Sequence, residues 1–450
     1  MTTSEFTRTC LLLVCAVAAT TQTALAQSTV APQSPRQALQ PVPALEEIPG
    51  SLRLDRATAV RLAETRAPEV IGAEAEVRGV AGFRRAADRG LHRPPRIEVS
   101  AGPRHVPGGG RLGVDATVGI FQEFSTGQYG RELDRFAAST KVRADSHLEA
   151  TRRDARVRAS LAWLDALEAR AILVIRKRSV EGAKEILRIA QARVAAGRSS
   201  PGEAALAQSL LGSAEAAVLA AEGSITVADA NLRHVCGIEL HRPLQVTGTL
   251  DAGADSIHEE SLRAHVRDSS PDLLAAKAEA STAEQAARLG RASSRPFLDL
   301  GPSVTRESTG EWLVLGHVRL PLPGIDPAAA DNAERQLLAH MARAEAGVTE
   351  QAVLKNVEID LHEREHAIRV RDLLRTGSIE PAERAAHEAE LQYEAGRTDL
   401  VSVIAARREL YDAHERWTQA ATDVQRAEAR LERYVAVTQL QKGRLAPGGK

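Results

Sequence analysis

The chain has 450 residues, with 58 Lys and Arg against 59 Asp and Glu and a formal net charge of −1. This balance, without a large block of one sign, argues against a nucleic-acid partner and against a polybasic membrane surface. Aromatic residues make up only 3 %, while Ala, Leu, Glu and Arg are abundant. That composition is typical of long helices in close contact rather than of a conventional globular core.

The first 26 residues have the pattern of a secretory signal peptide. An apolar run at 10–20 follows Arg8, and Ala24-Leu25-Ala26 offers a small-x-small cleavage site. The run is too short to span a membrane. Lipidation is the alternative, but Cys15 follows a valine rather than a small residue. We therefore expect cleavage after residue 26 and a flexible extension, rich in Pro, Gln and Ser, over 27–50.

Residues 51–236 predict one structural module. Apolar residues at helical spacing run from 54 to about 91, and Pro68 should kink this helix or begin a second one. Apolar and polar residues then alternate at 96–101 and 114–120, which is the pattern of half-buried strands. Nothing breaks a helix from about 128 to 196. After the break at 197–201 a second helix returns to about 235, which gives an antiparallel hairpin.

Residues 257–438 predict a second module with the same order. A helical stretch at 258–292 precedes alternating runs at 298–304 and 312–318, and a helix from about 327 to 395 turns and returns from about 399 to 437. An irregular connector, 237–256, joins the modules and contains one short extended piece at 244–247; a flexible tail, 439–450, ends the chain.

The two modules are internal repeats. The glycines at the two hairpin turns, Gly197 and Gly396, are 396 − 197 = 199 residues apart. A period of this length indicates a duplicated module, because solenoid units repeat every ~20–50 residues.

Four strands with one apolar face are too few to close a barrel. The chain after the signal contains no run of 18 apolar residues, so we expect no transmembrane helix. Open strand edges cannot face lipid, where unpaired backbone groups are costly. Copies of the chain must therefore share a barrel, and three copies would give ~12 strands and a lumen, whereas two would give ~8 and a filled interior. The alternative is a periplasmic coiled-coil protein with short β-hairpin insertions, because barrel strands are a weak signal.

The order of elements resembles the TolC-like outer-membrane efflux family over about 54–437. The matching features are the module of helix, two strands and long hairpin in two copies, the early motif Pro68-Glu69-Val70, and a glycine at each hairpin turn. The segments 193–203 and 319–324 are similar to the branch that serves heavy-metal exporters, the CzcC-like proteins. Multidrug ducts share much of these two segments.

The resemblance implies an α+β membrane channel. It implies a homotrimer with a transmembrane β-barrel of four strands per protomer, ~12 in all, and a long α-helical barrel. The barrel would lie in outer-membrane lipid and the helices in the periplasm. The role implied is non-enzymatic and needs no cofactor: the exit duct of a tripartite pump for metal cations or small toxic compounds, working with a periplasmic adaptor protein and an inner-membrane transporter. A type I protein secretion duct is the alternative.

The resemblance also marks a periplasmic gate. An acid six residues after the first turn glycine contacts a tyrosine three residues before the second in the closed pore, and Glu203 and Tyr393 hold these positions. The basic gate residue is displaced, since Thr398 stands in its place with Arg397 beside it. The alternative is that Glu203 is only an acidic residue in the first turn of a helix, favoured there by ~0.3–1 kcal/mol.

Two acidic positions of the family's pore are altered. Ser402 and Ala405 stand where the family can carry two aspartates that ring the pore. We therefore expect this chain to lack that cation-binding constriction.

The family docks its periplasmic adaptor on the two hairpin turns. The corresponding adaptor-docking residues are Gly197, Arg198, Ser199 and Ser200 in the first turn, and Gly396, Thr398 and Asp399 in the second.

His362-Glu-Arg-Glu-His366 matches the zinc-protease motif H-E-x-x-H. On a helix the two histidines would lie one turn apart and could bind a metal, with Glu363 as base. No histidine follows between 367 and 374 to serve as a third ligand, and the motif lies within a long charged helix. A zinc metallopeptidase is therefore the least favoured function. We expect a solvated helix face, with a lumen-facing site for passing metal ions as the next alternative.

Overall fold

A computed structural model of the chain describes residues 51–87, 94–105, 112–125, 127–250, 259–295, 297–320 and 328–434. The predicted signal peptide (1–26), N-terminal extension (27–50) and tail (439–450) lie outside the described residues. So does part of the predicted connector, 251–256.

The first module follows the predicted order. Its elements are β1 (Leu52–Leu54), α2 (Arg56–Arg66), α3 (Pro68–Ala87), β2 (Arg96–His105), β3 (Leu112–Ser125), α4 (Tyr129–Ala195) and α5 (Pro201–Val235). Pro68 begins a second helix rather than kinking one continuous helix, because proline fits the first helical turn, where its missing N–H costs nothing. Strands β2 and β3 are longer than the alternating runs alone indicated, and β1 was not predicted.

The second module repeats this order, which agrees with the predicted duplication. Its elements are β4 (Leu244–Val246), α6 (Glu259–Ser269), α7 (Pro271–Ser293), β5 (Phe297–Arg306), β6 (Trp312–Arg319), α8 (Ala329–Leu374), α9 (Glu380–Glu394) and α10 (Leu400–Leu431). Strand β4 coincides with the extended piece predicted in the connector, and it pairs in parallel with β1.

The prediction of one continuous helix from about 327 to 395 was wrong in one respect. A π-helical turn, Arg375–Ile379, separates α8 from α9. Pro381 has no N–H to donate, and in an α-helix its ring clashes with the carbonyl of the residue four positions earlier, here Gly377. A short π-helical turn accommodates such an irregularity within a long helix.

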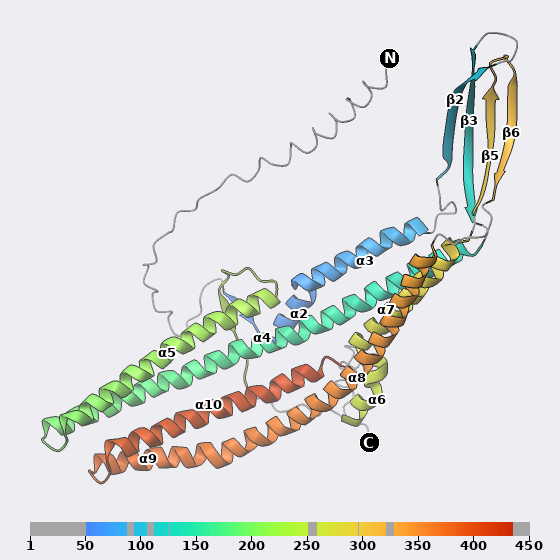
Figure 1. The fold of residues 1–450 in the computed structure, drawn as a ribbon. Coiled ribbons are helices and arrows are strands. Elements are labelled where there is room, and N and C mark those ends of the chain that lie inside the picture. The colour runs from blue at the N-terminus through green and yellow to red at the C-terminus, as the bar shows by residue number, and fades with distance from the viewer. Residues whose placement is uncertain are drawn as a thin grey trace. The chain divides into compact units, whose positions relative to one another are not determined.

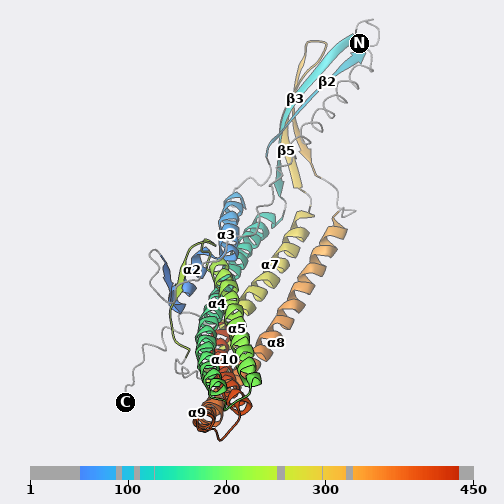
Figure 2. The same ribbon diagram turned by 90° about the vertical axis from the view of Figure 1, so that its left-hand side faces the viewer.

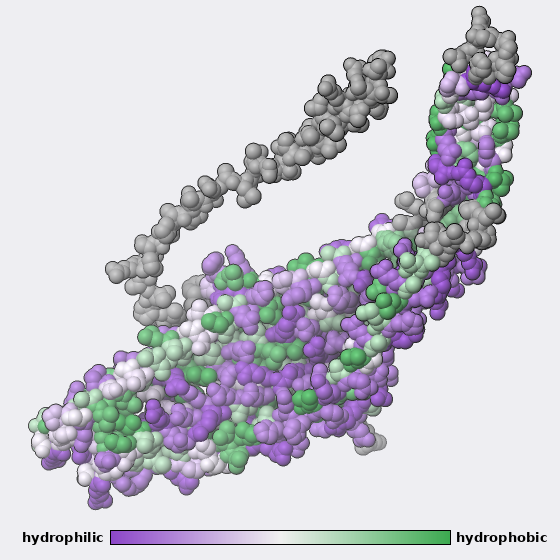
Figure 3. Space-filling model, in the orientation of Figure 1, coloured by the Kyte–Doolittle hydropathy of each residue, from purple (hydrophilic) through white to green (hydrophobic). Residues whose placement is uncertain are grey.

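Strands β2, β3, β5 and β6 form one antiparallel sheet in that order, so that β2 and β6 are its two edges. The register places like residues on the same face: Val99 pairs with Val118, and Val304 pairs with both Val118 and Val314. Their side chains are exposed, Val99 by 71 % and Val314 by 69 %. Figure 3 shows hydrophobic residues along the sides of the sheet with hydrophilic ones between them, whereas hydrophilic residues cover most of the helical surface in that view.

The opposite face of the sheet is polar. Asp299 is buried there and forms ion pairs with Arg96 at 2.8 Å and with Arg319 at 3.7 Å. Thr117 and Thr305, which pair across β3 and β5, join their hydroxyls at 2.9 Å. The sheet therefore has one apolar and one polar face, as the alternation predicted.

Helix α4 is the central helix of the fold and packs against α2, α3, α5, α7 and α10. Alanine is the commonest of its buried residues, and such small side chains allow neighbouring helices to approach closely. Figures 1 and 2 show that the sheet continues from the ends of α3, α4, α7 and α8, while the hairpin turns of α4–α5 and α9–α10 lie at the opposite end.

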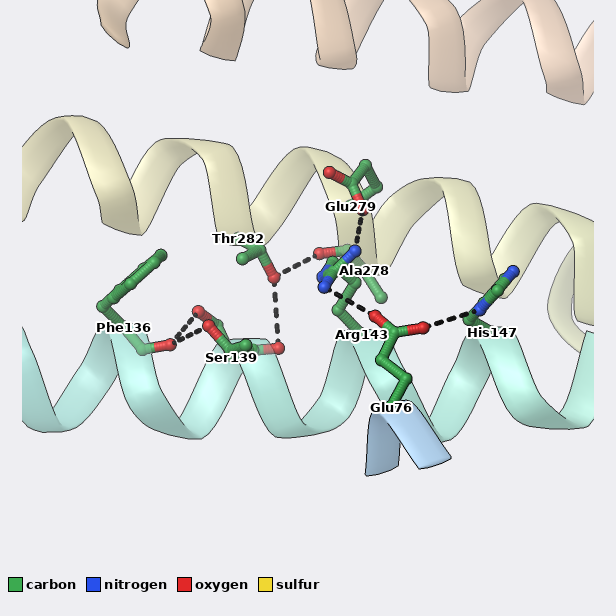
Figure 4. A network of polar contacts seen from close by, with 9 residues as sticks. Glu76, Phe136, Ser139, Arg143, His147, Ala278, Glu279 and Thr282 are labelled. Carbon is green, nitrogen blue, oxygen red and sulfur yellow. Dashed lines mark hydrogen bonds and ion pairs between the residues drawn. The ribbon is translucent and has the colours of Figure 1, made fainter. Parts of the chain in front are cut away.

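Polar contacts between α3, α4 and α7 add to this packing (Figure 4). Arg143 of α4 forms ion pairs with Glu76 of α3 at 2.7 Å and with Glu279 of α7 at 3.3 Å. The hydroxyl of Thr282 donates to the carbonyl of Ser139 at 3.1 Å. The contacts with Glu279 and Thr282 of α7 join the first module to the second.

The largest apolar cluster surrounds Trp163, whose indole Nε1 donates to the carbonyl of Leu54 at 3.2 Å. Cys236 is buried in this cluster as a free thiol, and burial raises its pKa to about 11. A second cluster joins α6, α8 and the end of α10 through Val266, Val357 and Leu431.

Helix α5 is long and apolar enough to cross a membrane by length and composition alone, and 11 % of its most apolar 18-residue stretch is buried. The expectation of no transmembrane helix stays a prediction. Leu219 and Val227 are 69 % and 71 % exposed. Helix α5 therefore presents an uncovered apolar surface in the single chain.

Candidate functional site: the two hairpin turns

The two hairpin turns have the same local geometry. Gly197 and Gly396 adopt φ angles of +65° and +73°, a region that only glycine occupies without strain. In the first turn the amide of Arg198 donates to the carbonyl of Arg193 at 2.9 Å. In the second, the amide of Arg397 donates to the carbonyl of Gln392 at 2.8 Å. These bonds across a left-handed glycine are the Schellman pattern, which ends each helix and starts its return.

The return helices begin differently. Ser200 precedes Pro201 as the N-cap of α5 and makes no side-chain capping bond. Asp399 caps α10, since its Oδ1 accepts from the amide of Ser402 at 2.8 Å. Hydrogen bonding from Ser402, first from its side chain and then from its amide, lowers the pKa of the Asp399 carboxyl. Asp399, predicted as a docking residue, therefore also has a structural role.

The ends of the two hairpins share one apolar core. It contains residues from all four helices: Ile186, Ala190, Ala207, Tyr393, Leu400 and Val403. The hairpins of one chain are thus packed together at their ends rather than separated by solvent.

Glu203 and Tyr393, predicted as gate partners, are in contact. The Tyr393 hydroxyl donates to Glu203 Oε2 at 3.1 Å, and the tyrosine is only 2 % exposed. Burial, and then the hydrogen bond to Glu203, raise the pKa of Tyr393. Sequence reasoning identified the pair; its role as a gate stays a prediction.

The other predicted residues of the turns are more exposed and make fewer side-chain contacts. Arg198 and Arg397 are exposed, and within the described part of the chain neither guanidinium has a hydrogen bond or ion pair. Ser199 and Thr398 are half-buried. The geometry therefore brings Arg397 to the turn surface, but it does not bring its side chain to Glu203 or Tyr393.

Sequence reasoning missed Arg193. Its Cζ lies 4.5 Å from the centre of the Tyr393 ring, and its Nη1 donates to the Tyr393 carbonyl at 2.5 Å. The only sequence signal was an arginine one turn before Gly197, where a cation also complements the C-terminal end of a helix. Nothing in the sequence indicated that it would reach across to the second hairpin.

Ion pairs continue this contact along α4 and α10. Arg176 pairs with Glu415 at 2.5 Å, and Arg426 pairs with Asp165 at 2.6 Å and with Glu168 at 2.5 Å. Burial raises the pKa of Glu168, while Arg426 opposes that rise. The two hairpins of one chain are therefore joined by charges as well as by the apolar core.

His362 and His366 lie on one face of α8, with ring centroids 6.4 Å apart. Both are exposed, and Glu363 is paired with Arg430. Among the described residues no group of three potential ligands could hold a metal ion. The described residues therefore offer these histidines no third ligand.

A known protein family matches the chain in two segments, one in each module. The sequence model of the family described as "Outer membrane efflux protein" matches residues 113–238 and 262–437. No curated protein sequence matches the chain.

The fold is similar to those of several solved outer-membrane channels. The structure of OprN has a TM-score of 0.64 and 17 % identity, covering 84 % of this chain and 89 % of its own. CmeC of Campylobacter jejuni has a TM-score of 0.65 and 15 % identity, covering 86 % of this chain and 88 % of its own. CusC has a TM-score of 0.63 and 16 % identity, covering 89 % of this chain and 98 % of its own. At these identities the likeness concerns the fold.

Proposed function

Because the chain belongs to the outer membrane efflux protein family, we propose that three copies assemble into the exit duct of a tripartite efflux pump. Family membership makes it a transport protein of the outer membrane rather than an enzyme, with its helical part in the periplasm. The number of copies, the partner pump and the class of exported compound are proposed here and do not follow from family membership alone.

The observation that carries the proposal is the sheet. Its apolar face is exposed, with Val118 at 49 % and Val318 at 74 %, and its edges β2 and β6 have no partner strand among the described residues. A surface of this kind is unfavourable in water, and open edges are unfavourable in lipid. Lipid on the apolar face and a neighbouring copy at each edge would satisfy both requirements.

The polar face supports the same orientation. Asp299 with its two arginines, and Arg104 with Glu307 at 2.9 Å, are charged groups on the face opposite the valines. Charges are costly on the lipid side of a barrel and are tolerated in its lumen. We therefore assign the polar face to a water-filled lumen.

Three copies fit these requirements better than two. A barrel of ~8 strands is filled by its own side chains, whereas ~12 strands leave a lumen. The exposed apolar surface of α5, with Leu219 and Val227, supports contacts between copies, because a neighbouring hairpin would cover it. The alternative of a periplasmic coiled-coil protein without a channel leaves the exposed valines of the sheet unexplained.

At the periplasmic end we propose that Glu203 and Tyr393 hold the hairpins in a closed position. Tyr393 is almost completely buried and its hydroxyl has an acceptor on the other hairpin. Separation of the hairpins would break this bond and expose the apolar core around it. In this proposal the turns at Gly197 and Gly396 receive the periplasmic adaptor, which connects the duct to an inner-membrane transporter.

Transport can be tested in a strain of the source bacterium that lacks this chain. We expect greater sensitivity to divalent metal cations or to small lipophilic toxins, restored by the wild-type chain and not by a chain without residues 94–125. Sensitivity to metals alone would assign it to metal export. Loss of a secreted protein with unchanged sensitivity would assign it to type I secretion instead.

A further inference from the structure

Arg193 connects the two hairpins at their ends. It lies in the last turn of α4, one turn before Gly197. Its Nη1 donates to the main-chain carbonyl of Tyr393 at 2.5 Å, and its Cζ lies 4.5 Å from the centre of the Tyr393 ring. Its Nε is buried and has no hydrogen-bond partner among the described residues. The guanidinium is thus committed to Tyr393 and not to a carboxylate.

Tyr393 is held from two sides by the first hairpin. Arg193 comes from α4 and lies against the ring, while Glu203 comes from α5 and accepts the hydroxyl at 3.1 Å. The Tyr393 carbonyl also accepts from the amide of Gly396 at 3.0 Å, within the turn of the second hairpin. Arg193 therefore contacts both the Tyr393 ring and the Tyr393 carbonyl, which belongs to the turn of the second hairpin.

We propose that Arg193 is the basic residue of the gate, and that it positions Tyr393 for Glu203. This inference rests on the proposed gate between Glu203 and Tyr393. It replaces Arg397 in that role, because the Arg397 side chain is exposed and has no polar contact with the rest of the described chain. Arg193 acts through Tyr393 and contacts neither the exported compound nor the pore itself in this proposal.

A simpler role for Arg193 predicts something different. A cation in the last turn stabilises any helix through the dipole, and a lysine does this as well as an arginine. Stacking on a ring while donating to a carbonyl requires the planar guanidinium, which lysine lacks. Arg193→Lys therefore separates the two roles, since it keeps the charge and removes the geometry.

The test is single-channel recording of the purified full-length protein in planar bilayers. The variants are Arg193→Lys, Arg193→Met and Glu203→Gln. Arg188→Lys is the matched control, because Arg188 lies five residues earlier in α4, is exposed, and among the described residues forms its ion pair with Glu185 of the same helix. We expect Arg193→Lys to raise the open probability about ten-fold or more, since losing a hydrogen bond to a charged group is worth at least that factor. Arg193→Met should raise it at least as much, and Arg188→Lys should leave it unchanged.

The outcomes separate this inference from the gate on which it rests. If Glu203→Gln opens the pore and both Arg193 variants stay closed, Arg193 has no positioning role although the gate stands. If Arg193→Met opens the pore and Arg193→Lys does not, charge alone is sufficient and the inference is wrong. If no variant opens the pore, the gate itself fails. A melting temperature of Arg193→Lys equal to that of wild type, with a raised open probability, would support positioning over a general loss of stability.

Discussion

Adjacent residues of β2 provide a matched test of which face of the sheet meets lipid. Val99 is 71 % exposed on the apolar face and pairs with Val118, whereas Ser100 is exposed on the polar face and pairs with Thr117. We predict that Val99→Arg destabilises the assembled protein strongly and that Ser100→Arg does not. Because the two positions are neighbours in one strand, they share the same depth in the membrane.

The magnitude follows from the position in the strand. Strand β2 has 10 residues, which span ~33 Å at ~3.3 Å per residue. Val99 is the fourth of them and therefore lies ~10 Å from one end, within an apolar band ~25 Å tall. An arginine facing lipid costs ~2–4 kcal/mol at the midplane and less near the interfaces. We expect about 2 kcal/mol for Val99→Arg, and less than ~1 kcal/mol for Ser100→Arg, whose side chain would enter water.

The assay is urea unfolding in lipid vesicles, followed by the fluorescence of Trp312 on β6, which is 66 % exposed on the apolar face. A Trp312→Phe chain gives the background from the other tryptophans. Equal losses of unfolding free energy for the two variants would refute the assignment of the faces. A larger loss for Ser100→Arg would reverse it.

The remaining predictions concern the hairpins. Glu203→Gln combined with Tyr393→Phe should raise conductance, and a wild-type conductance would leave only the helix-dipole interpretation of Glu203. Because the pKa of Tyr393 is raised, the neutral phenol favours the closed state; this contribution is complete below about pH 10 and is lost as pH rises through the raised pKa. Wild-type conductance should therefore be flat from about pH 6 to 9 and rise only in stronger alkali, a rise that Tyr393→Phe should lack. Gly197→Trp should abolish efflux while the oligomer still assembles. Gly197→Asn should retain efflux, because asparagine tolerates the same φ and is not bulky. Equal efflux in both variants would exclude this turn from the docking surface. Arg426→Met should lower the free energy of unfolding by ~1–3 kcal/mol, because it leaves two partly buried carboxylates on α4 without a partner; a change below ~0.5 kcal/mol in thermal or urea unfolding would contradict this.

Much of the fold could be predicted because local chemistry decides it. The left-handed glycines at 197 and 396 and the prolines at 68 and 271 determine where helices end and begin. The alternation at 114–120 determines which side chains of β3 share a face. These signals act over a few residues, so one sequence is enough to detect them.

The features that sequence reasoning missed depend on distant contacts or on small geometric preferences. Strand β1 has three residues and forms only because β4, far along the chain, lies beside it. The π-helical turn at Arg375–Ile379 accommodates a single proline within an otherwise regular helix. Arg193 reaches Tyr393, 200 residues away, through the packing of two hairpins. The Glu203–Tyr393 contact was expected only because a family resemblance supplied the long-range pairing.

The central claim is that neighbouring copies join β2 to β6 in a closed ring of three. Disulfide cross-linking tests it directly in a Cys236→Ala background, with Val99→Cys on β2 combined in turn with Val314→Cys, Gly316→Cys or Val318→Cys on the same face of β6. At least one pair should produce covalent dimers and trimers in outer-membrane preparations under oxidising conditions, with no larger species. Monomers alone for every pair, or a ladder that continues beyond three copies, would contradict the account.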